Sequence, residues 1–329
     1  MLAAVCSAYG PPESVSVREV PSPAVGAGQV RVRVGAAAVN FPDVLFIADQ
    51  YQLTVPVPFV PGSEFAGVVA EVGSDVSGVS VGDRVMGTTT VGAFAEEVVV
   101  PASSVTLVPS GVSDASAAAF GVAHRTAYHV LRSVACVRPG EKLVVLGAGG
   151  GVGLAAVQLG ALLGASVTAV ASSEAKLAAA SDSGAVAVIN HRTAAGGLRQ
   201  ALRSAFPDGA DVVVDPVGGD LAEPALRALR WGGRFVTVGY ASGTVPRIPL
   251  NLVLLKGCQI LGFQFRDFAA HAGADLARNE AELLELLAAG KALPHIGATF
   301  KLAEAAAALR YVADGKAIGK VVLAIGLLG

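Results

Sequence analysis

The chain changes its pattern of hydrophobic and polar positions near residue 122. Before that point, short alternating or wholly apolar stretches are separated by clusters of Gly and Pro, a pattern that predicts short strands joined by turns. Short strands with frequent turns are typical of a β-rich barrel-like or sandwich module. We expect strands over residues 29–39, 64–72, 84–86 and 94–100.

After residue 122, apolar runs alternate with helical stretches. This alternation predicts a doubly wound α/β domain, in which helices cover both faces of a parallel sheet. The expected strands are 143–146, 166–171, 186–189, 211–214, 235–238 and 258–261, and the expected helices between them include 176–181, 198–206 and 221–230. Two further helices, 267–289 and 303–313, and a final strand, 319–325, are expected to follow.

The uncharged run of residues 143–173 has two interpretations. A membrane helix needs about 20 continuous apolar residues, so length alone permits one. However, five glycines crowd positions 147–153, and each Gly weakens a helix by roughly 1 kcal/mol. The run therefore predicts a strand, a glycine turn, a helix from Leu154 to about Leu163, and a second strand.

A glycine turn between a strand and a helix is suited to binding phosphate. Glycines let backbone N–H groups approach a pyrophosphate, and the helix N-terminus adds a favourable dipole. The G-x-G-x-x-G spacing is absent, because the sixth residue counted from Gly147 is Val152, and glycines recur at every third position instead. The strand–turn–helix–strand order predicts a nucleotide site, with a purely structural turn as the alternative.

The end of the expected strand 166–171 indicates which nucleotide binds. An NAD site usually has Asp or Glu at this place to bind the ribose 2′-hydroxyl. This chain has Ser172 and Ser173, with Lys176 one helical turn later. Hydroxyl donors and a cation suit a 2′-phosphate, so we expect NADPH. Ser173 is also a suitable N-cap for a helix that begins at Glu174, whose carboxylate we expect to point outward.

Composition narrows the classes of partner. The 329 residues are 53% hydrophobic and 15% charged, and the net charge of −2 gives no basic surface for nucleic acid or a membrane. The first residues lack the basic and long apolar segments of a signal peptide, so we expect a cytoplasmic location. Cys6, Cys136 and Cys258 are isolated, which indicates neither a disulfide framework nor a zinc cluster.

Six motifs carry a resemblance to a known family: AVN (38–40) followed by Asp43, PGSEFAG (61–67), GDRV (82–85), GGVG (150–153), DPVGG (215–219) and GGR (232–234). Together they resemble the medium-chain dehydrogenase/reductase superfamily over the whole chain. Within it, the stretches QYQLTVPVPFVPGSEFAGVV and IPLNLVLLKG are similar to the zinc-independent quinone oxidoreductases, in particular their quinone oxidoreductase-like protein 2 branch. The resemblance implies a GroES-like β-rich catalytic domain (1–122 and 266–329) and a Rossmann NADP(H)-binding domain (123–265).

The chain departs from the zinc alcohol dehydrogenases at their metal sites. It has Asn40 where those enzymes have a Cys ligand and Ser63 where they have a His, and the loop with four structural-zinc cysteines is missing after Gly87. Catalytic zinc needs Cys and His donors, so we expect no metal. Without a Lewis acid, alcohol oxidation is not expected, whereas hydride delivery to an electron-poor C=C or quinone is.

The resemblance also implies roles for individual residues. Asn40 is expected to line the nicotinamide and substrate cleft and, with Tyr51, to be catalytic. Leu45 stands where quinone reductases often have a second Tyr, which puts a two-tyrosine clamp on the substrate carbonyl in doubt. The implied cofactor-binding residues are Asn40, Thr126, Gly150, Gly151, Val152, Ser172, Ser173, Lys176, His191, Gly239, Tyr240, Phe263 and Lys320.

The implied activity is NADPH-dependent reduction of quinones or other α,β-unsaturated carbonyls by hydride transfer to a small electrophilic substrate. Two alternatives remain: an enoyl-thioester (acyl-CoA) reductase, and a protein that binds NADPH without catalysing turnover. Relatives commonly dimerise through the far edge of the cofactor sheet. We therefore expect a homodimer through about residues 243–263, with the apolar stretch 248–255 at the interface.

Overall fold

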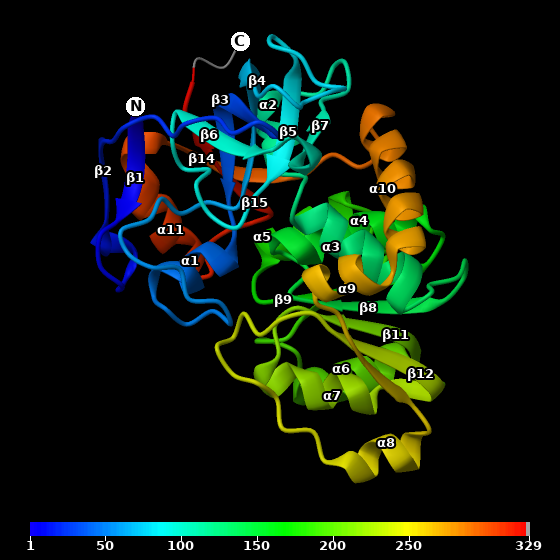
Figure 1. Cartoon of the computed structure of the whole chain (residues 1–329). Coiled ribbons are helices and arrows are strands. Elements are labelled where there is room, and N and C mark those ends of the chain that lie inside the picture. The colour runs from blue at the N-terminus through cyan, green and yellow to red at the C-terminus, as the bar shows by residue number, and fades with distance from the viewer. Residues whose placement is uncertain (327–329) are drawn as a thin grey trace. The chain divides into compact units, whose positions relative to one another are not determined.

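The computed structural model describes residues 1–326. The chain divides into two compact units, Met1–Val122 with Leu293–Gly329, and Ala123–Ala292 (Figure 1). The expected return to the first domain at residue 266 is therefore too early. Helix α10 (Gly273–Ala288) belongs to the second unit because its Glu280 and Glu282 bind Arg125 and Arg132 in that unit.

The first unit is built around a seven-stranded sheet in the order β14-β15-β3-β4-β5-β7, with β6 also paired to β3. A separate two-stranded ribbon joins β1 and β2. The strands of this unit are β1 (Leu2–Cys6), β2 (Val15–Glu19), β3 (Gln29–Val39), β4 (Glu64–Val72), β5 (Arg84–Thr88), β6 (Glu97–Pro101), β7 (Val105–Leu107), β14 (Ile296–Lys301) and β15 (Lys320–Ala324). Its helices are α1 (Phe41–Ile47), α2 (Asp114–Ala118) and α11 (Ala305–Ala313).

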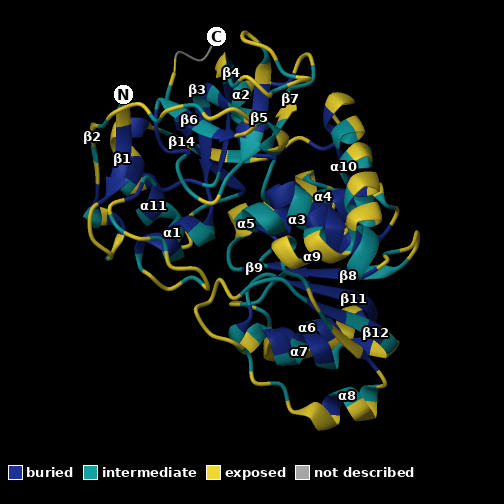
Figure 2. Cartoon of the chain, viewed as in Figure 1, coloured by how far each residue is buried: buried dark blue, intermediate teal, exposed yellow. Residues whose placement is uncertain are grey.

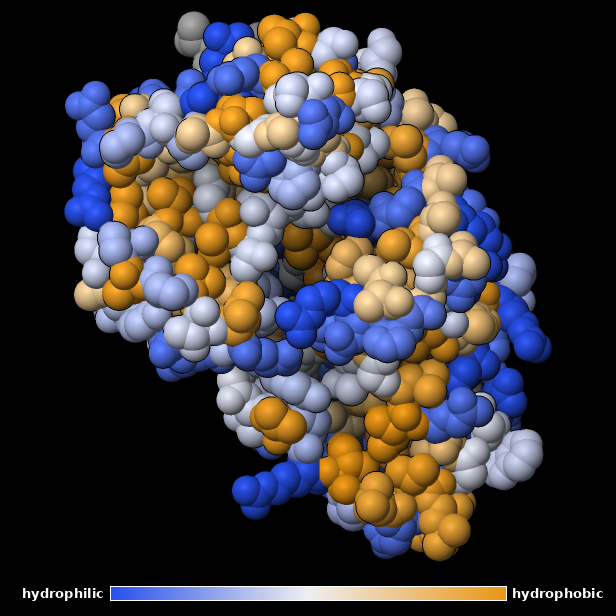
Figure 3. Space-filling view, viewed as in Figure 1, coloured by the Kyte–Doolittle hydropathy of each residue, from blue (hydrophilic) through white to orange (hydrophobic). Residues whose placement is uncertain are grey.

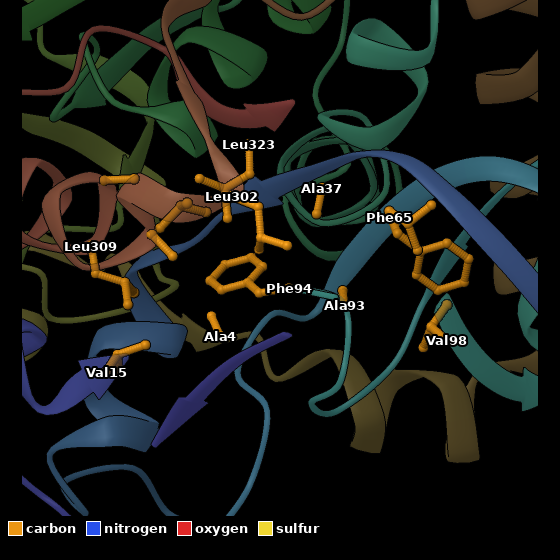
Figure 4. Packing of buried hydrophobic residues seen from close by; sticks show 14 of the residues in the cluster. Ala4, Val15, Ala37, Phe65, Ala93, Phe94, Val98, Leu302, Leu309 and Leu323 are labelled. Atoms are coloured by element: carbon orange, nitrogen blue, oxygen red, sulfur yellow. The ribbon is translucent and has the colours of Figure 1, made fainter. Parts of the chain in front are cut away.

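Aromatic and small apolar side chains fill the core of the first unit. Figure 4 shows the ring of Phe94 among Ala4, Ala93 and Leu302, and Phe65 beside Val98. The Phe94 ring also fixes the backbone before β4. At Gly62 (φ +103°), a Cβ would lie 2.3 Å from Cδ1 of that ring, so only glycine fits there. The packing of Phe94 against Gly62 thereby fixes the position of the backbone just before β4.

The second unit is a six-stranded parallel sheet in the order β10-β9-β8-β11-β12-β13. This is the strand order of the dinucleotide-binding fold, and its ligand crevice lies where the order reverses, between β8 and β11. The strands are β8 (Lys142–Leu146), β9 (Ser166–Ala171), β10 (Ala187–Asn190), β11 (Ala210–Asp215), β12 (Leu229–Thr237) and β13 (Gln259–Gly262). The expected GroES-like and Rossmann architecture is confirmed.

Helices cover the faces of this sheet, so its central strands are buried (Figure 2). The helices of this unit are α3 (Ala123–His129), which continues as a π-helical turn (Val130–Val134), α4 (Gly151–Leu162), α5 (Glu174–Asp182), α6 (Gly197–Ala205), α7 (Ala222–Arg227), α8 (Leu250–Lys256), α9 (Phe265–His271) and α10. The expected helix over 267–289 is interrupted at Ala272, whose φ of −122° and ψ of 46° are not helical. The expected helix over 221–230 ends early, because β12 already begins at Leu229.

The uncharged run of residues 143–173 forms β8, the glycine turn, α4 and β9 rather than one long helix. Helix α4 starts at Gly151 with Gly150 as its N-cap, three residues before the expected start. None of the described helices combines the length and the apolar character that crossing a bilayer requires.

Candidate active site

The register of three strands brings Asn40, Glu64 and Lys320 together at one end of the first unit's sheet. Strand β15 pairs antiparallel with β3, so that Val321 lies opposite Val39 and Lys320 faces the end of β3. On the other side of β3, Ala38 pairs with Glu64. Residues far apart in the sequence thus begin or end their strands at the same place.

These side chains form a closed polar network. Lys320 Nζ donates to Asn40 Oδ1 at 2.5 Å and to Glu64 Oε1 at 2.6 Å. Asn40 Nδ2 donates to the same Glu64 oxygen at 2.8 Å, and the other Glu64 oxygen accepts from the backbone N–H of Val122 at 2.8 Å. Asn40, Glu64 and Lys320 are 7%, 0% and 3% exposed. Burial on this scale requires charges to be paired, as they are here.

Asp43 adds a second carboxyl group to the network. Its Oδ2 accepts from the backbone N–H of Asn40 at 2.7 Å, which caps helix α1, while its buried Oδ1 has no hydrogen-bond partner within the described residues. Burial raises the pKa of Asp43 to about 7, against the opposing hydrogen bonds from Asn40 and Ser63 and the charge of Lys320. Asp43 is therefore close to half protonated at neutral pH.

Tyr51 lies in the same unit, after helix α1. Its ring packs on Phe46, with ring centroids 4.6 Å apart, and it is partly buried against the core. Leu45, on α1, presents no hydroxyl group. The first unit therefore contains the expected Tyr51, but its proposed contact with substrate stays a prediction.

In the second unit, the glycine turn is too tight for any other residue at one position. A Cβ on Gly153 would lie 2.1 Å from the carbonyl oxygen of Gly147, which is backbone and cannot move aside. Gly147 itself has a φ of +59°. Gly150, Gly151 and Val152 are half-buried at the start of α4. The turn and the helix N-terminus thus leave a cradle of the kind that accepts a pyrophosphate.

The side chain of Lys176 lies across this turn. A Cβ on Gly149 would meet the Lys176 methylenes at 2.5 Å, so the stem of that lysine packs directly on the glycine backbone. Ser173 is the N-cap of α5 and accepts from the backbone N–H of Lys176 at 3.4 Å, so the capping role is confirmed. Glu174 is exposed, as expected, and its carboxylate binds Asn190 Nδ2 at 2.7 Å.

Lys176, His191 and Arg192 form a basic group at the ends of β9 and β10, beside the half-buried Ser172. Desolvation and the charge of Arg192 lower the pKa of Lys176, and desolvation, Arg192 and Lys176 lower the pKa of His191. Positive charges that oppose each other in this way are stabilised by an anion placed among them. The arrangement fits a 2′-phosphate.

The remaining expected cofactor residues are in less specific surroundings. Thr126 is half-buried on α3. Gly239 and Tyr240 follow β12 rather than ending it, and Tyr240 is 38% exposed. Phe263 follows β13 and donates its backbone N–H to the carbonyl oxygen of Thr237 at 3.1 Å. These residues lie at the carboxyl ends of parallel strands or on a neighbouring helix, where a doubly wound sheet binds its ligands.

Lys320 differs from its expected surroundings, and the sequence did not single out its partner Glu64. The resemblance predicts that Lys320 contacts the cofactor edge, whereas its ammonium group is buried and bound to Glu64 and Asn40. Glu64 stands in the sequence only as one residue of the PGSEFAG motif. An available signal was the single charge in the apolar stretch SEFAGVV, which requires a buried partner when that stretch is a central strand.

Comparisons with known proteins cover both units. The alcohol dehydrogenase GroES-like domain matches residues 26–110, and the zinc-binding dehydrogenase family matches residues 151–288. Quinone oxidoreductase-like protein 2 of Bos taurus is 37% identical over 98% of this chain and 92% of its own length.

Two solved structures are also similar throughout. A mycobacterial protein in complex with NADPH has a TM-score of 0.91 and 30% identity over 98% of this chain and 99% of that chain. The quinone oxidoreductase of Escherichia coli in complex with NADPH has a TM-score of 0.90 and 27% identity over 98% of this chain and 100% of that chain. The matches extend over both units, and the chain therefore belongs to the quinone oxidoreductase-like family of the medium-chain dehydrogenase/reductase superfamily.

Proposed function

We propose that this protein is an NADPH-dependent oxidoreductase that reduces quinones or other small α,β-unsaturated carbonyls. The observation that carries the proposal is the basic group of Lys176, His191 and Arg192 beside the glycine turn. An NAD site would have a carboxylate there for the ribose hydroxyl. The two NADPH-bound structural relatives support the same choice of cofactor.

The residues present fit NADPH in two places. The turn around Gly150, Gly151 and Val152 offers backbone N–H groups to the pyrophosphate, and Ser172, Ser173, Lys176 and His191 offer donors to the 2′-phosphate. When bound, the nicotinamide supplies a hydride. We further propose that Thr126, Gly239, Tyr240 and Phe263 contact the nicotinamide half.

We propose that the first unit serves the acceptor, through Asn40 and Tyr51, without zinc. Asn40 and Ser63 offer amide and hydroxyl groups rather than the thiolate and imidazole that catalytic zinc prefers. The buried cation beside Asn40 is instead the ammonium group of Lys320, 2.5 Å from its amide oxygen. An acceptor that is already electron-poor is the substrate such a site suits best.

The direct test follows NADPH and NADH oxidation by absorbance with a panel of benzoquinones, alkenones and crotonyl-CoA, before and after treatment with a chelator. We expect turnover of quinones or enones, preference for NADPH, and no loss with the chelator. Reduction of crotonyl-CoA alone would establish the thioester reductase instead. Tight NADPH binding with no turnover of any acceptor would show that the protein binds NADPH without catalysing its oxidation.

We also propose a homodimer through the β13 edge of the second unit's sheet. Leu250, Leu254 and Leu255 on α8 are 77%, 81% and 75% exposed, and Trp231 is 79% exposed. Hydrophobic atoms gather on this part of the surface, which lies at the bottom of Figure 3. An exposed apolar area beside an unpaired strand edge is suited to a second copy of the same chain.

The dimer is tested by light scattering after size-exclusion chromatography. We expect Leu254→Glu to give monomers, whereas Val186→Glu, at a 70% exposed position before the opposite edge strand β10, is the matched control and leaves the dimer intact. A monomeric wild-type protein would contradict the proposal. The cytoplasm remains the proposed location, to be checked by cell fractionation.

A further inference from the structure

We propose that Lys320 is a positioning residue that orients and polarises the amide group of Asn40, so that one amide N–H becomes a strong donor to the carbonyl oxygen of the acceptor. The inference rests on the proposed function, since it presumes a carbonyl acceptor at Asn40. It adds a role for Lys320 and Glu64, and it replaces the expected contact between Lys320 and the cofactor.

The network leaves the Asn40 amide only one orientation. An ammonium group can only donate hydrogen bonds, so the Asn40 atom 2.5 Å from Lys320 Nζ must be the oxygen. A carboxylate can only accept, so the Asn40 atom 2.8 Å from Glu64 Oε1 must be the nitrogen. Charges of opposite sign on the two sides of the amide therefore fix which edge carries the N–H groups.

One of the two amide hydrogens has no strong partner within the described residues. The short bond to Glu64 engages the first hydrogen. The remaining contacts of Nδ2 are long, 3.3 Å to Ser63 Oγ and 3.4 Å to the carbonyl oxygen of Ala38. Contacts of this length are weaker than the usual 2.9–3.0 Å hydrogen bond. A carbonyl oxygen that approaches Asn40 would therefore gain a better bond than the one it displaces.

Lys320 strengthens that donor by binding the other end of the amide. An ammonium at the amide oxygen withdraws electrons through the conjugated O–C–N group, and hydrogen bonds in such a chain reinforce each other in a buried, low-dielectric site. As hydride reaches the β-carbon of the acceptor, the C=C electron pair moves toward the carbonyl and negative charge grows on its oxygen. A polarised N–H placed at that oxygen stabilises the charge, and a proton later completes the reduction.

Glu64 holds both Lys320 and Asn40 in this arrangement. Its Oε1 accepts from both Lys320 and Asn40, and the Val122 backbone holds its Oε2. Without Glu64 the ammonium group would be buried with its charge uncompensated, which destabilises the folded state. Removal of either charge alone therefore threatens folding, whereas removal of both together is often tolerated.

The first experiment requires no turnover. The chain has four asparagines, Asn40, Asn190, Asn251 and Asn279, so asparagine-selective ¹⁵N labelling gives four side-chain NH₂ signals, and Asn40→Ala identifies one of them. In the folded double variant K320M/E64Q, we expect the two Asn40 proton shifts to move toward those of the exposed Asn251. The exposed-lysine control Lys316→Met should move none of them. Unchanged Asn40 shifts in the folded double variant would overturn the proposal.

The second experiment measures kinetics and NADPH affinity for the same variants. We expect K320M/E64Q to lose about 100-fold in kcat, as when an oxyanion donor is removed, with the NADPH dissociation constant unchanged. The loss should be larger for an alkenone than for a strongly oxidising quinone, because the weaker electrophile depends more on the donor. A selective loss of NADPH affinity would make Lys320 a cofactor contact and overturn the inference. If wild-type protein reduces no acceptor, the proposed function fails, and the NMR result still decides whether Lys320 polarises Asn40.

Discussion

The two compact units use their polar groups in opposite ways. In the first unit, Asn40, Asp43, Glu64 and Lys320 are buried and bound to one another. In the second unit, Lys176, His191 and Arg192 remain partly or fully exposed and repel one another. In the first arrangement the charges of Lys320 and Glu64 are paired without a ligand, whereas in the second an anion placed among the three basic groups would stabilise them.

The comparison shows that preorganisation has two sources in one chain. The buried network holds its donor in place through charge pairing and strand register, so its geometry does not depend on the substrate. The glycine turn holds its N–H groups in place through the absence of side chains, and the stem of Lys176 packs directly on that turn.

The largest effect is expected at the glycine turn. Gly153→Ala would put a Cβ 2.1 Å from the Gly147 carbonyl oxygen, and the strain costs about 3 kcal/mol. If the turn shifts to relieve that strain, the same energy appears as a loss of NADPH affinity of on the order of 100-fold. Titration calorimetry and thermal unfolding measure the two effects together. Gly273→Ala is the control, because nothing lies within 4 Å of its Cβ. Wild-type values of both stability and NADPH affinity in Gly153→Ala would contradict the close packing of the turn.

The next effect concerns the charge of Lys176. Lys176→Met keeps the stem that packs on Gly149 but removes the ammonium group. We expect NADPH binding to weaken about 30-fold, the value of one charge-assisted hydrogen bond, and NADH binding to stay nearly unchanged. Lys291→Met, at an exposed position of the same unit, is the control. Equal losses for both cofactors would exclude a 2′-phosphate contact.

The buried carboxyl group of Asp43 predicts a pH dependence of stability. Its folded pKa of about 7 lies above its ordinary value of 3.8, so the native state holds a proton that the unfolded chain has released. The stability it confers is fully present below pH 4 and is lost as the pH rises through 7. The wild-type protein should lose on the order of 2 kcal/mol from this group between pH 5 and 8, and Asp43→Asn should not. Urea unfolding across this range measures the difference, and parallel curves would show that Asp43 titrates normally.

The smallest effect is expected at Tyr51. Tyr51→Phe keeps the ring that packs on Phe46 and removes only the hydroxyl group. We expect kcat/KM for the acceptor to fall about fivefold, equal to about 1 kcal/mol, with no change in the unfolding midpoint. Tyr311→Phe, a partly buried tyrosine of the same unit that packs on Phe300, is the control. No change at Tyr51 would leave Asn40 as the only proposed contact with the acceptor.

The pattern of hydrophobic and polar residues predicted the bounds of those strands in which it is long or wholly apolar. Strands β3, β4 and β9 have the expected bounds, since each is a long or wholly apolar run between turn signals. The elements that were not predicted are strands β1, β2 and β7 and helices α1, α2, α3 and α8. Helix α1 has only seven residues, FPDVLFI, which are too few for periodicity to separate helix from strand.

The part of the site whose residues lie close together in the sequence was predictable. The glycine turn and Ser172, Ser173 and Lys176 lie within one strand–helix–strand segment, so spacing alone places them together. Lys320 and Glu64 are separated by more than half the chain, and their contact depends on the register of β15 and β4 on either side of β3. Register is decided by tertiary packing, which no local pattern reports.

The pairing of β15 with β3 also has a consequence during protein synthesis. All of the second unit leaves the ribosome before β15 does, so that unit has the opportunity to fold while the first still lacks a strand. Until β15 arrives, Glu64 is without its cation and β3 without one of its neighbours. Once residues up to about 300 have left the ribosome, the nascent chain would therefore combine a complete nucleotide-binding unit with an unfinished β-sheet, an intermediate that exposes hydrophobic surface to chaperones.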